Sequence, residues 1–153
     1  MRAKIDKILE YMCIFFMSAL VIDVLWQVTS RYVLVAPSSF TDELAGFLLI
    51  WVGLLGAAYV AGKNEHLAID LLVQKSSPKA KRRLNLFIQF IMGIFAFSVL
   101  IIGGTWLVYT RFLLRVTSAA LSIPLGIVYL VLPISGLLIL YYSIDNFKKY
   151  LQK

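Results

Sequence analysis

The sequence predicts an all-α integral membrane protein with four transmembrane helices. Of its 153 residues, 61% are hydrophobic and 15% are charged, whereas a soluble domain is nearer half apolar and a quarter charged. The apolar residues form four continuous blocks, each near the roughly 20 residues that span a bilayer, and continuous blocks argue against a transmembrane barrel. We expect one membrane domain, residues 1–153, with spans at about 8–35, 42–61, 84–110 and 124–144.

The placement of the basic residues predicts the orientation of these helices. Three Lys or Arg residues lie at the N-terminus, six in the 62–83 loop and three in the tail; the opposite side has only Arg31, Arg111 and Arg115. The positive-inside rule therefore places both termini in the cytoplasm. The net charge of +7 belongs to these helix flanks, so we expect no nucleic-acid binding.

The first span begins after a short basic segment, and it carries Asp23, Gln27 and Arg31 in its second half. Its apolar run, from Ile8 to about Val35, is longer than a signal-peptide core, so we expect an uncleaved helix. Asp23, Gln27 and Arg31 recur every four residues and share one helix face. Asp23 and Arg31 lie about 12 Å apart along the axis, too far for a direct ion pair.

Two interpretations of this polar face remain open. Charge inside hydrocarbon costs on the order of 3 kcal/mol, so such residues usually face protein or water. The face is either a proton or ion site, or a polar seam against another helix or subunit. The seam is favoured because no second acidic residue lies at the depth of Asp23.

A short turn leads into the second span. Pro37 ends the first helix, and Ser39 with Asp42 matches the S-x-x-[DE] capping pattern. Asp42 and Glu43 then lie in the first turn of the next helix, where acids complement the helix dipole. The turn brings the helix ends together, so either acid is also placed to pair with Arg31.

The second span carries a close-packing motif. Gly53 and Ala57 form a small-xxx-small pair that permits close helix approach, and Trp51 suits packing or lipid contact. In the 62–83 loop that follows, apolar residues around Asp70 predict a short interfacial helix. His66 has no second His or Cys near it, so we expect no metal site.

The third and fourth spans complete the membrane domain. The third, at about 84–110, is long enough to tilt. In the fourth, Pro124 suits a first helical turn, while Pro133 and Gly136 predict a kink. The single cysteine, Cys13, excludes an intrachain disulfide.

Catalytic chemistry is not indicated anywhere in the sequence. We find no nucleophile–base arrangement, phosphate loop or metal cluster, and so expect no enzyme activity and no cofactor. One alternative is a self-assembling proton-coupled drug antiporter that uses Asp23, and another is a membrane anchor for a respiratory or other enzyme. The residues themselves favour a small scaffold subunit whose polar seam meets a larger partner.

Short motifs support a family resemblance over nearly the whole chain. They are Gln27-Val-x-x-Arg31-Tyr32, Thr41-Asp42-Glu43-Leu44-Ala45, Trp51, Gly56-Ala57-Ala58, His66 followed by Asp70, the run Pro124–Gly126, and Pro133. Because these motifs occur in this order, the chain resembles the small membrane subunit (DctQ-type, including SiaQ proteins) of tripartite ATP-independent periplasmic (TRAP) transporters. The resemblance implies a multi-pass scaffold subunit in the bacterial inner membrane, among membrane lipids, beside a large DctM/SiaM-type subunit.

The resemblance also implies the rest of the transporter and residue roles. A periplasmic binding protein would deliver an organic acid (a C4-dicarboxylate, sialic acid or another sugar acid), and a sodium gradient would drive its import. Residues expected at the large-subunit interface are Asp23, Gln27, Arg31, Trp51, Gly53 and Ala57. Asp42 and Glu43 would set the outer turn where the binding protein docks, and His66 and Asp70 would fix the cytoplasmic loop.

Overall fold

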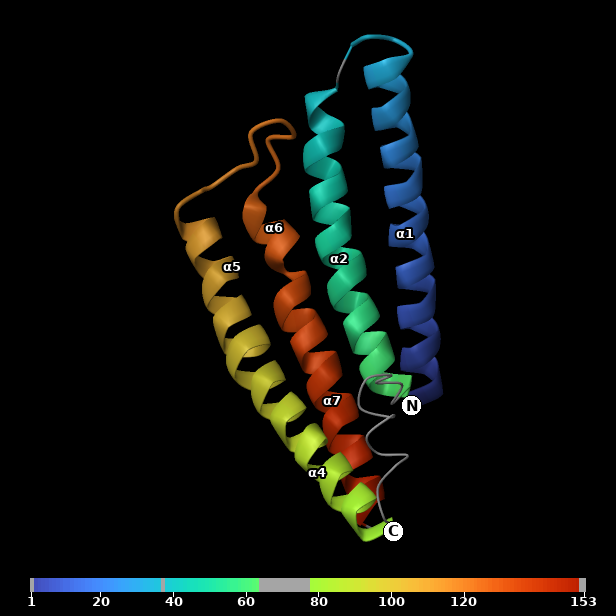
Figure 1. The fold of residues 1–153 in the computed structure, drawn as a ribbon. Coiled ribbons are helices and arrows are strands. Elements are labelled where there is room, and N and C mark those ends of the chain that lie inside the picture. Colours follow the sequence, from blue (N-terminus) through green and yellow to red (C-terminus); the bar gives the residue numbers. More distant parts are fainter. Residues whose placement is uncertain (1, 37, 64–77, 152–153) are drawn as a thin grey trace. The chain divides into compact units, whose positions relative to one another are not determined.

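The computed structural model describes residues 2–36, 38–63 and 78–151 (Figure 1). In these ranges the chain is helical apart from short connections. An isolated antiparallel β-bridge joins Thr117 and Pro124. The chain divides into two compact units. Unit 1 comprises Met1–Gly56 and Trp106–Val131, and unit 2 comprises Ala57–Thr105 and Leu132–Lys153. Each unit is described by itself.

The helices confirm the predicted fold class. They are α1 (Arg2–Tyr32), α2 (Ser39–Lys63), α4 (Pro78–Phe95), the π-helix η1 (Ala96–Gly103), α5 (Gly104–Leu113), α6 (Leu125–Tyr129) and α7 (Val131–Leu151). Four helical stretches within the described ranges are long and apolar enough to cross a membrane. Most of these helices extend past their apolar blocks. Charged residues at the helix ends can continue the backbone hydrogen bonding while their side chains reach the polar interface.

Unit 1 joins α1, the first part of α2, α5 and α6 through aromatic side chains. The Phe16 ring lies 5.0 Å from the Trp51 ring, centroid to centroid, and the Trp51 Nε1–H donates to the Val128 carbonyl at 3.1 Å. Phe112 covers Gly126 so closely that a Cβ there would lie 2.6 Å from the ring. Trp51 is therefore a packing residue inside this unit.

Unit 2 packs α7 against α4, η1 and the end of α2. Tyr142 is fully buried, and its ring covers Gly62. The Asn146 Nδ2–H donates to the Ala61 carbonyl at 3.3 Å. Gly136 lies against the π-helix, where an added Cβ would come within 2.8 Å of the Leu100 Cβ.

The predicted irregularity of the fourth span is present, but it lies before Pro133. The helix is interrupted at Leu130, whose N–H donates to the Ile127 carbonyl at 3.3 Å. Pro133 has no N–H to offer Tyr129, four residues earlier, so the helical ladder cannot continue regularly through this turn. Pro124 precedes the helix as its cap residue, with ψ of 119°, instead of occupying the first turn.

The predicted capping arrangement of α2 is also shifted by one residue. The helix begins at Ser39 itself, so Ser39 is not the residue that precedes it. The hydroxyl of Thr41 donates to the Ser38 carbonyl at 2.8 Å and ties the turn to the new helix.

Candidate functional site

An exposed polar cluster lies where α1 ends and α2 begins. The Arg31 Nη2 is 3.4 Å from one carboxylate oxygen of Asp42 and 3.5 Å from the other. The Gln27 side-chain amide also donates to Asp42. The predicted pairing across the turn is therefore confirmed for Asp42. The side chains of Arg31 and Asp42 are 48% and 53% exposed, so this ion pair lies on the surface of unit 1.

Glu43, the neighbouring acid, has a different environment. Its carboxylate accepts the backbone N–H groups of Ala119 at 3.0 Å, Ala120 at 2.9 Å and Leu121 at 2.9 Å. Three successive backbone N–H groups form a concave anion-binding nest. Glu43 thus holds the loop between α5 and α6 against the start of α2.

The loop that Glu43 binds is itself a compact turn. The Ser118 N–H donates to the Ile123 carbonyl at 2.9 Å, and the Leu125 N–H donates to the Val116 carbonyl at 2.9 Å. These bonds point the N–H groups of the loop tip at the carboxylate. Sequence reasoning missed this contact because the two segments are more than 70 residues apart and share no periodic pattern.

Asp23 does not reach the exposed cluster. Only 7% of Asp23 is exposed, and its Oδ2 has no hydrogen-bond partner within the described part of the chain. Each four-residue step overshoots a helical turn by about 40°. Over two steps the predicted polar face therefore divides, with Asp23 turned inward, Gln27 half-buried and Arg31 exposed.

An exposed face of α2 begins at the polar cluster and extends along the helix. Asp42, Gly46, Leu49 and Gly53 recur at helical spacing and are all exposed. A Cβ added at Gly46 or Gly53 would meet no atom within 4 Å. Small residues on an open face let a second helix backbone approach closely.

Four other predicted residues fall in different places. Ala57 follows Gly53 by four residues along α2 and is exposed, but it belongs to unit 2. Trp51 points to the interior of unit 1, where its indole contacts Phe16 and Val128. His66 and Asp70, together with the interfacial helix expected in the 62–83 loop, lie outside the described residues.

These features define a class of protein: a small multi-pass membrane subunit with an open helix face. The chain belongs to the DctQ component family of tripartite ATP-independent periplasmic transporters, whose family model matches residues 20–153. The resemblance seen in the short motifs is confirmed.

Three curated relatives bear the same kind of name. A candidate TRAP transporter small permease protein of Haemophilus influenzae is 31% identical over 137 residues, covering 88% of this chain and 82% of the relative. The sialic acid TRAP transporter small permease protein SiaQ of Vibrio cholerae is 27% identical, covering 67% and 60%. The C4-dicarboxylate TRAP transporter small permease protein DctQ of the same species is 28% identical, covering 66% and 43%.

The family assignment settles the broad function. The chain is the small permease subunit of a bacterial TRAP transporter, a multi-pass membrane protein and not an enzyme. Small subunits of this type pair with a large permease subunit. This assignment replaces both the drug antiporter and the respiratory anchor as interpretations.

Proposed function

We propose that this chain is the scaffold subunit of a sodium-driven importer of an organic acid in the bacterial inner membrane. It packs against the large permease subunit and stabilises it, and it helps receive the periplasmic binding protein. The observation that carries the proposal is the exposed Arg31–Asp42 pair beside the open glycine face of α2.

The open face suits a helix of the large subunit. Gly46 and Gly53 leave space for a partner backbone, and close packing drives helix association in lipid because the hydrophobic effect between helices is weak there. Arg31 and Asp42 lie at the end of this face, where polar contacts can fix its register. Asp23 and Trp51 are turned inward, so we expect them to support this surface without forming its contact area.

The orientation of the chain in the membrane is inferred from the placement of its basic residues. With both termini in the cytoplasm, the cluster at Gln27, Arg31 and Asp42 faces the periplasm, as does the loop held by Glu43. That is the side from which a periplasmic binding protein would approach.

The scaffold role is tested by the variants Arg31→Ala and Asp42→Ala. The pair is exposed in this chain, so each change should alter its own stability by less than about 1 kcal/mol. If the pair is buried in the complex, losing one partner should weaken association with the large subunit by at least about tenfold. Co-purification from native membranes measures this, and undiminished recovery would remove the pair from the interface.

A matched control exists in unit 2. Lys149 forms an exposed ion pair with Asp145 at 2.7 Å, four residues apart on α7. Lys149→Ala removes a comparable surface pair and should leave the recovery of the large subunit unchanged. An equal loss in this variant would indicate a general effect of surface charge.

Docking of the binding protein is tested by uptake. For Asp42→Ala complexes that retain the large subunit, we expect a raised half-saturating concentration of binding protein, measured in proteoliposomes with a sodium gradient and equal amounts of assembled transporter. The relatives named for sialic acid and for C4-dicarboxylates are about equally identical to this chain, so both substrates should be tried. Uptake that is unchanged at limiting binding protein would exclude Asp42 from docking.

A further inference from the structure

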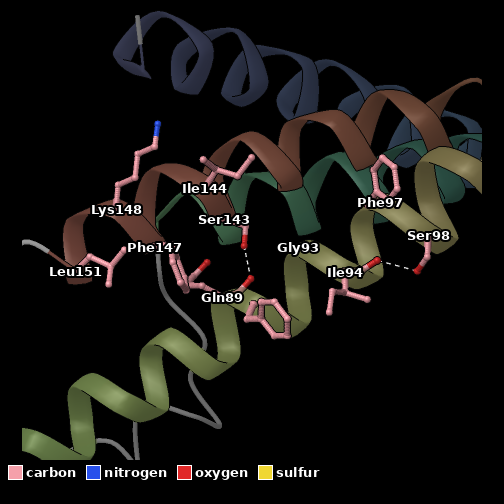
Figure 2. A pocket seen from close by; sticks show the side chains of 11 residues that line it. Gln89, Gly93, Ile94, Phe97, Ser98, Ser143, Ile144, Phe147, Lys148 and Leu151 are labelled. Carbon is pink, nitrogen blue, oxygen red and sulfur yellow. Dashed lines mark hydrogen bonds between the residues drawn. The ribbon is translucent and has the colours of Figure 1, made fainter.

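Unit 2 contains a long apolar groove between α4, η1 and α7 (Figure 2). Its volume is 610 Å³, which lies within the range of about 300–1,000 Å³ typical of ligand pockets. The walls are mainly aromatic and aliphatic, and the side chains that form them are Phe90, Ile94, Phe97, Ile144, Phe147 and Leu151. An occupant of these walls must be largely hydrocarbon.

The two hydroxyl groups along the groove are already bonded within the chain. The Ser143 hydroxyl donates to the Gln89 carbonyl, and the Ser98 hydroxyl donates to the Ile94 carbonyl at 2.7 Å (Figure 2). Gly93 lies beside this contact, and a Cβ there would lie 3.5 Å from the Ser143 Oγ. Since these hydroxyl protons are committed to backbone carbonyls, the groove favours an acyl chain over a polar ligand.

One end of the groove is basic. The stem of Lys148 lines it, and the ammonium group extends away from the apolar walls (Figure 2), as expected for a lysine at a membrane interface. Arg82 donates to the carbonyls of Tyr150 at 3.0 Å and Leu151 at 2.7 Å. These bonds tie the basic start of α4 to the basic end of α7.

The cations at this end are not equivalent. Lys149 is paired with Asp145 at 2.7 Å, and Arg82 is bonded to the end of α7. Lys148 and Arg83 are exposed, and neither shows an ion pair with any acid in the described ranges. Of these two cations Lys148 lines the groove, so positive charge without an ion-pair partner is available at this end of it.

We infer that this groove is a binding site for an anionic phospholipid. One acyl chain lies along Phe90, Ile94 and Phe147, and the phosphate headgroup is held by Lys148 at the basic end. Basic pockets between transmembrane helices recognise anionic headgroups in this way. A zwitterionic lipid would fill the same groove but would gain less from the positive charge.

The test uses the complete transporter in phosphatidylcholine vesicles. A small amount of phosphatidylglycerol carrying a photoreactive diazirine on its acyl chain is added, and the labelled peptides are identified by mass spectrometry. We expect labelling in α4 and α7, displaced by unlabelled phosphatidylglycerol at lower concentration than by phosphatidylcholine. Equal displacement by the two lipids would overturn the assignment of an anionic site.

Two pairs of variants localise the site. Ile94→Trp fills the groove and should abolish the labelling, while Ile91→Trp, on the same helix and comparably exposed (51% and 49%), lies outside the groove and should not. Lys148→Gln should lower the affinity for phosphatidylglycerol by about fivefold, and Lys149→Gln should leave it nearly unchanged.

The remaining outcomes overturn the inference. Labelling that persists in Ile94→Trp would show that the lipid lies elsewhere. An absence of labelling in α4 and α7, together with crosslinks from this groove to the large subunit, would show that a protein helix covers it. All four variants change exposed side chains, so unaltered recovery of the complex reports that they fold.

Discussion

At the residue scale, the adjacent acidic residues Asp42 and Glu43 make different contacts. Asp42 forms an exposed ion pair with Arg31, whereas the Glu43 carboxylate accepts three backbone N–H groups of a distant loop. They differ because neighbouring helix positions point about 100° apart. One acid therefore faces outward beside α1, and the other faces the α5–α6 loop.

The Glu43 contact makes a prediction at this scale. Glu43→Ala should speed amide hydrogen exchange at Ala119, Ala120 and Leu121 and slightly lower the free energy of unfolding, because the three hydrogen bonds to the carboxylate are lost. The cost is modest because Ala119 and Ala120 are exposed, so water can replace the carboxylate. Hydrogen-exchange mass spectrometry in detergent measures the effect.

Asp42→Ala is the control for this experiment. It removes a carboxylate from the same helical turn without touching the loop, so exchange at residues 119–121 should stay slow. If both variants loosen the loop equally, the effect would come from the charge of the helix terminus and not from the hydrogen bonds of Glu43.

At the element scale, the glycines of α2 and α7 meet opposite surroundings. Gly46 and Gly53 of α2 face open space. Gly136 of α7 faces the π-helix, where its absent Cβ would lie 2.8 Å from the Leu100 Cβ and 3.2 Å from the Ala96 carbonyl oxygen. These are backbone or near-backbone atoms that no side-chain rotation can move aside.

This contrast predicts changes of opposite sign. Gly136→Ala should destabilise the protein by about 1–3 kcal/mol through overpacking. Gly53→Ala should stabilise it by about 0.5–1 kcal/mol, because alanine is the better helix former and its methyl group has room. Thermal unfolding of the purified chain in one detergent compares them, and equal melting temperatures would contradict the packing described for Gly136.

The π-helix explains why α7 can approach so closely. A π-helix inserts extra residues per turn and is usually short and often found at functional positions. Here it spans Ala96–Gly103 and is followed directly by Gly104, whose absent Cβ would meet Leu132 at 2.8 Å. The missing side chain of Gly104 therefore leaves room for Leu132 and Pro133 beside the end of the π-helix.

At the scale of the whole molecule, charge should determine orientation in the membrane. The positive-inside rule predicts that the loop between α5 and α6 is periplasmic and that the start of α4 is cytoplasmic. In a Cys13→Ser background, Ala120→Cys and Ala80→Cys are matched reporters, since both replace an exposed alanine.

Labelling of whole cells tests this orientation. A membrane-impermeant maleimide should modify the cysteine at position 120 in intact cells and the cysteine at position 80 only after the cells are opened. The reverse pattern would place the polar cluster of Arg31 and Asp42 in the cytoplasm. It would also contradict the proposal that this surface receives the periplasmic binding protein.

Several properties followed from the sequence alone because they depend on local composition. The number of spans follows from four apolar blocks, each of which must satisfy its backbone hydrogen bonds internally in lipid. A short turn places Arg31 within reach of either Asp42 or Glu43, and the structure shows that Asp42 is the partner. The family follows from motifs in order, and the family model confirms it over residues 20–153.

Tertiary structure decided which faces are used. The inward position of Asp23, the packing of Trp51 on Phe16 and the capture of the α5–α6 loop by Glu43 all require segments distant in sequence to meet. In a membrane helix most positions are apolar whether they face lipid or protein, so hydrophobic periodicity does not distinguish the two faces. For this reason the sequence determined the helices and their order, whereas only the packed helices separated the open face of α2 and the groove beside α7 from the buried surfaces.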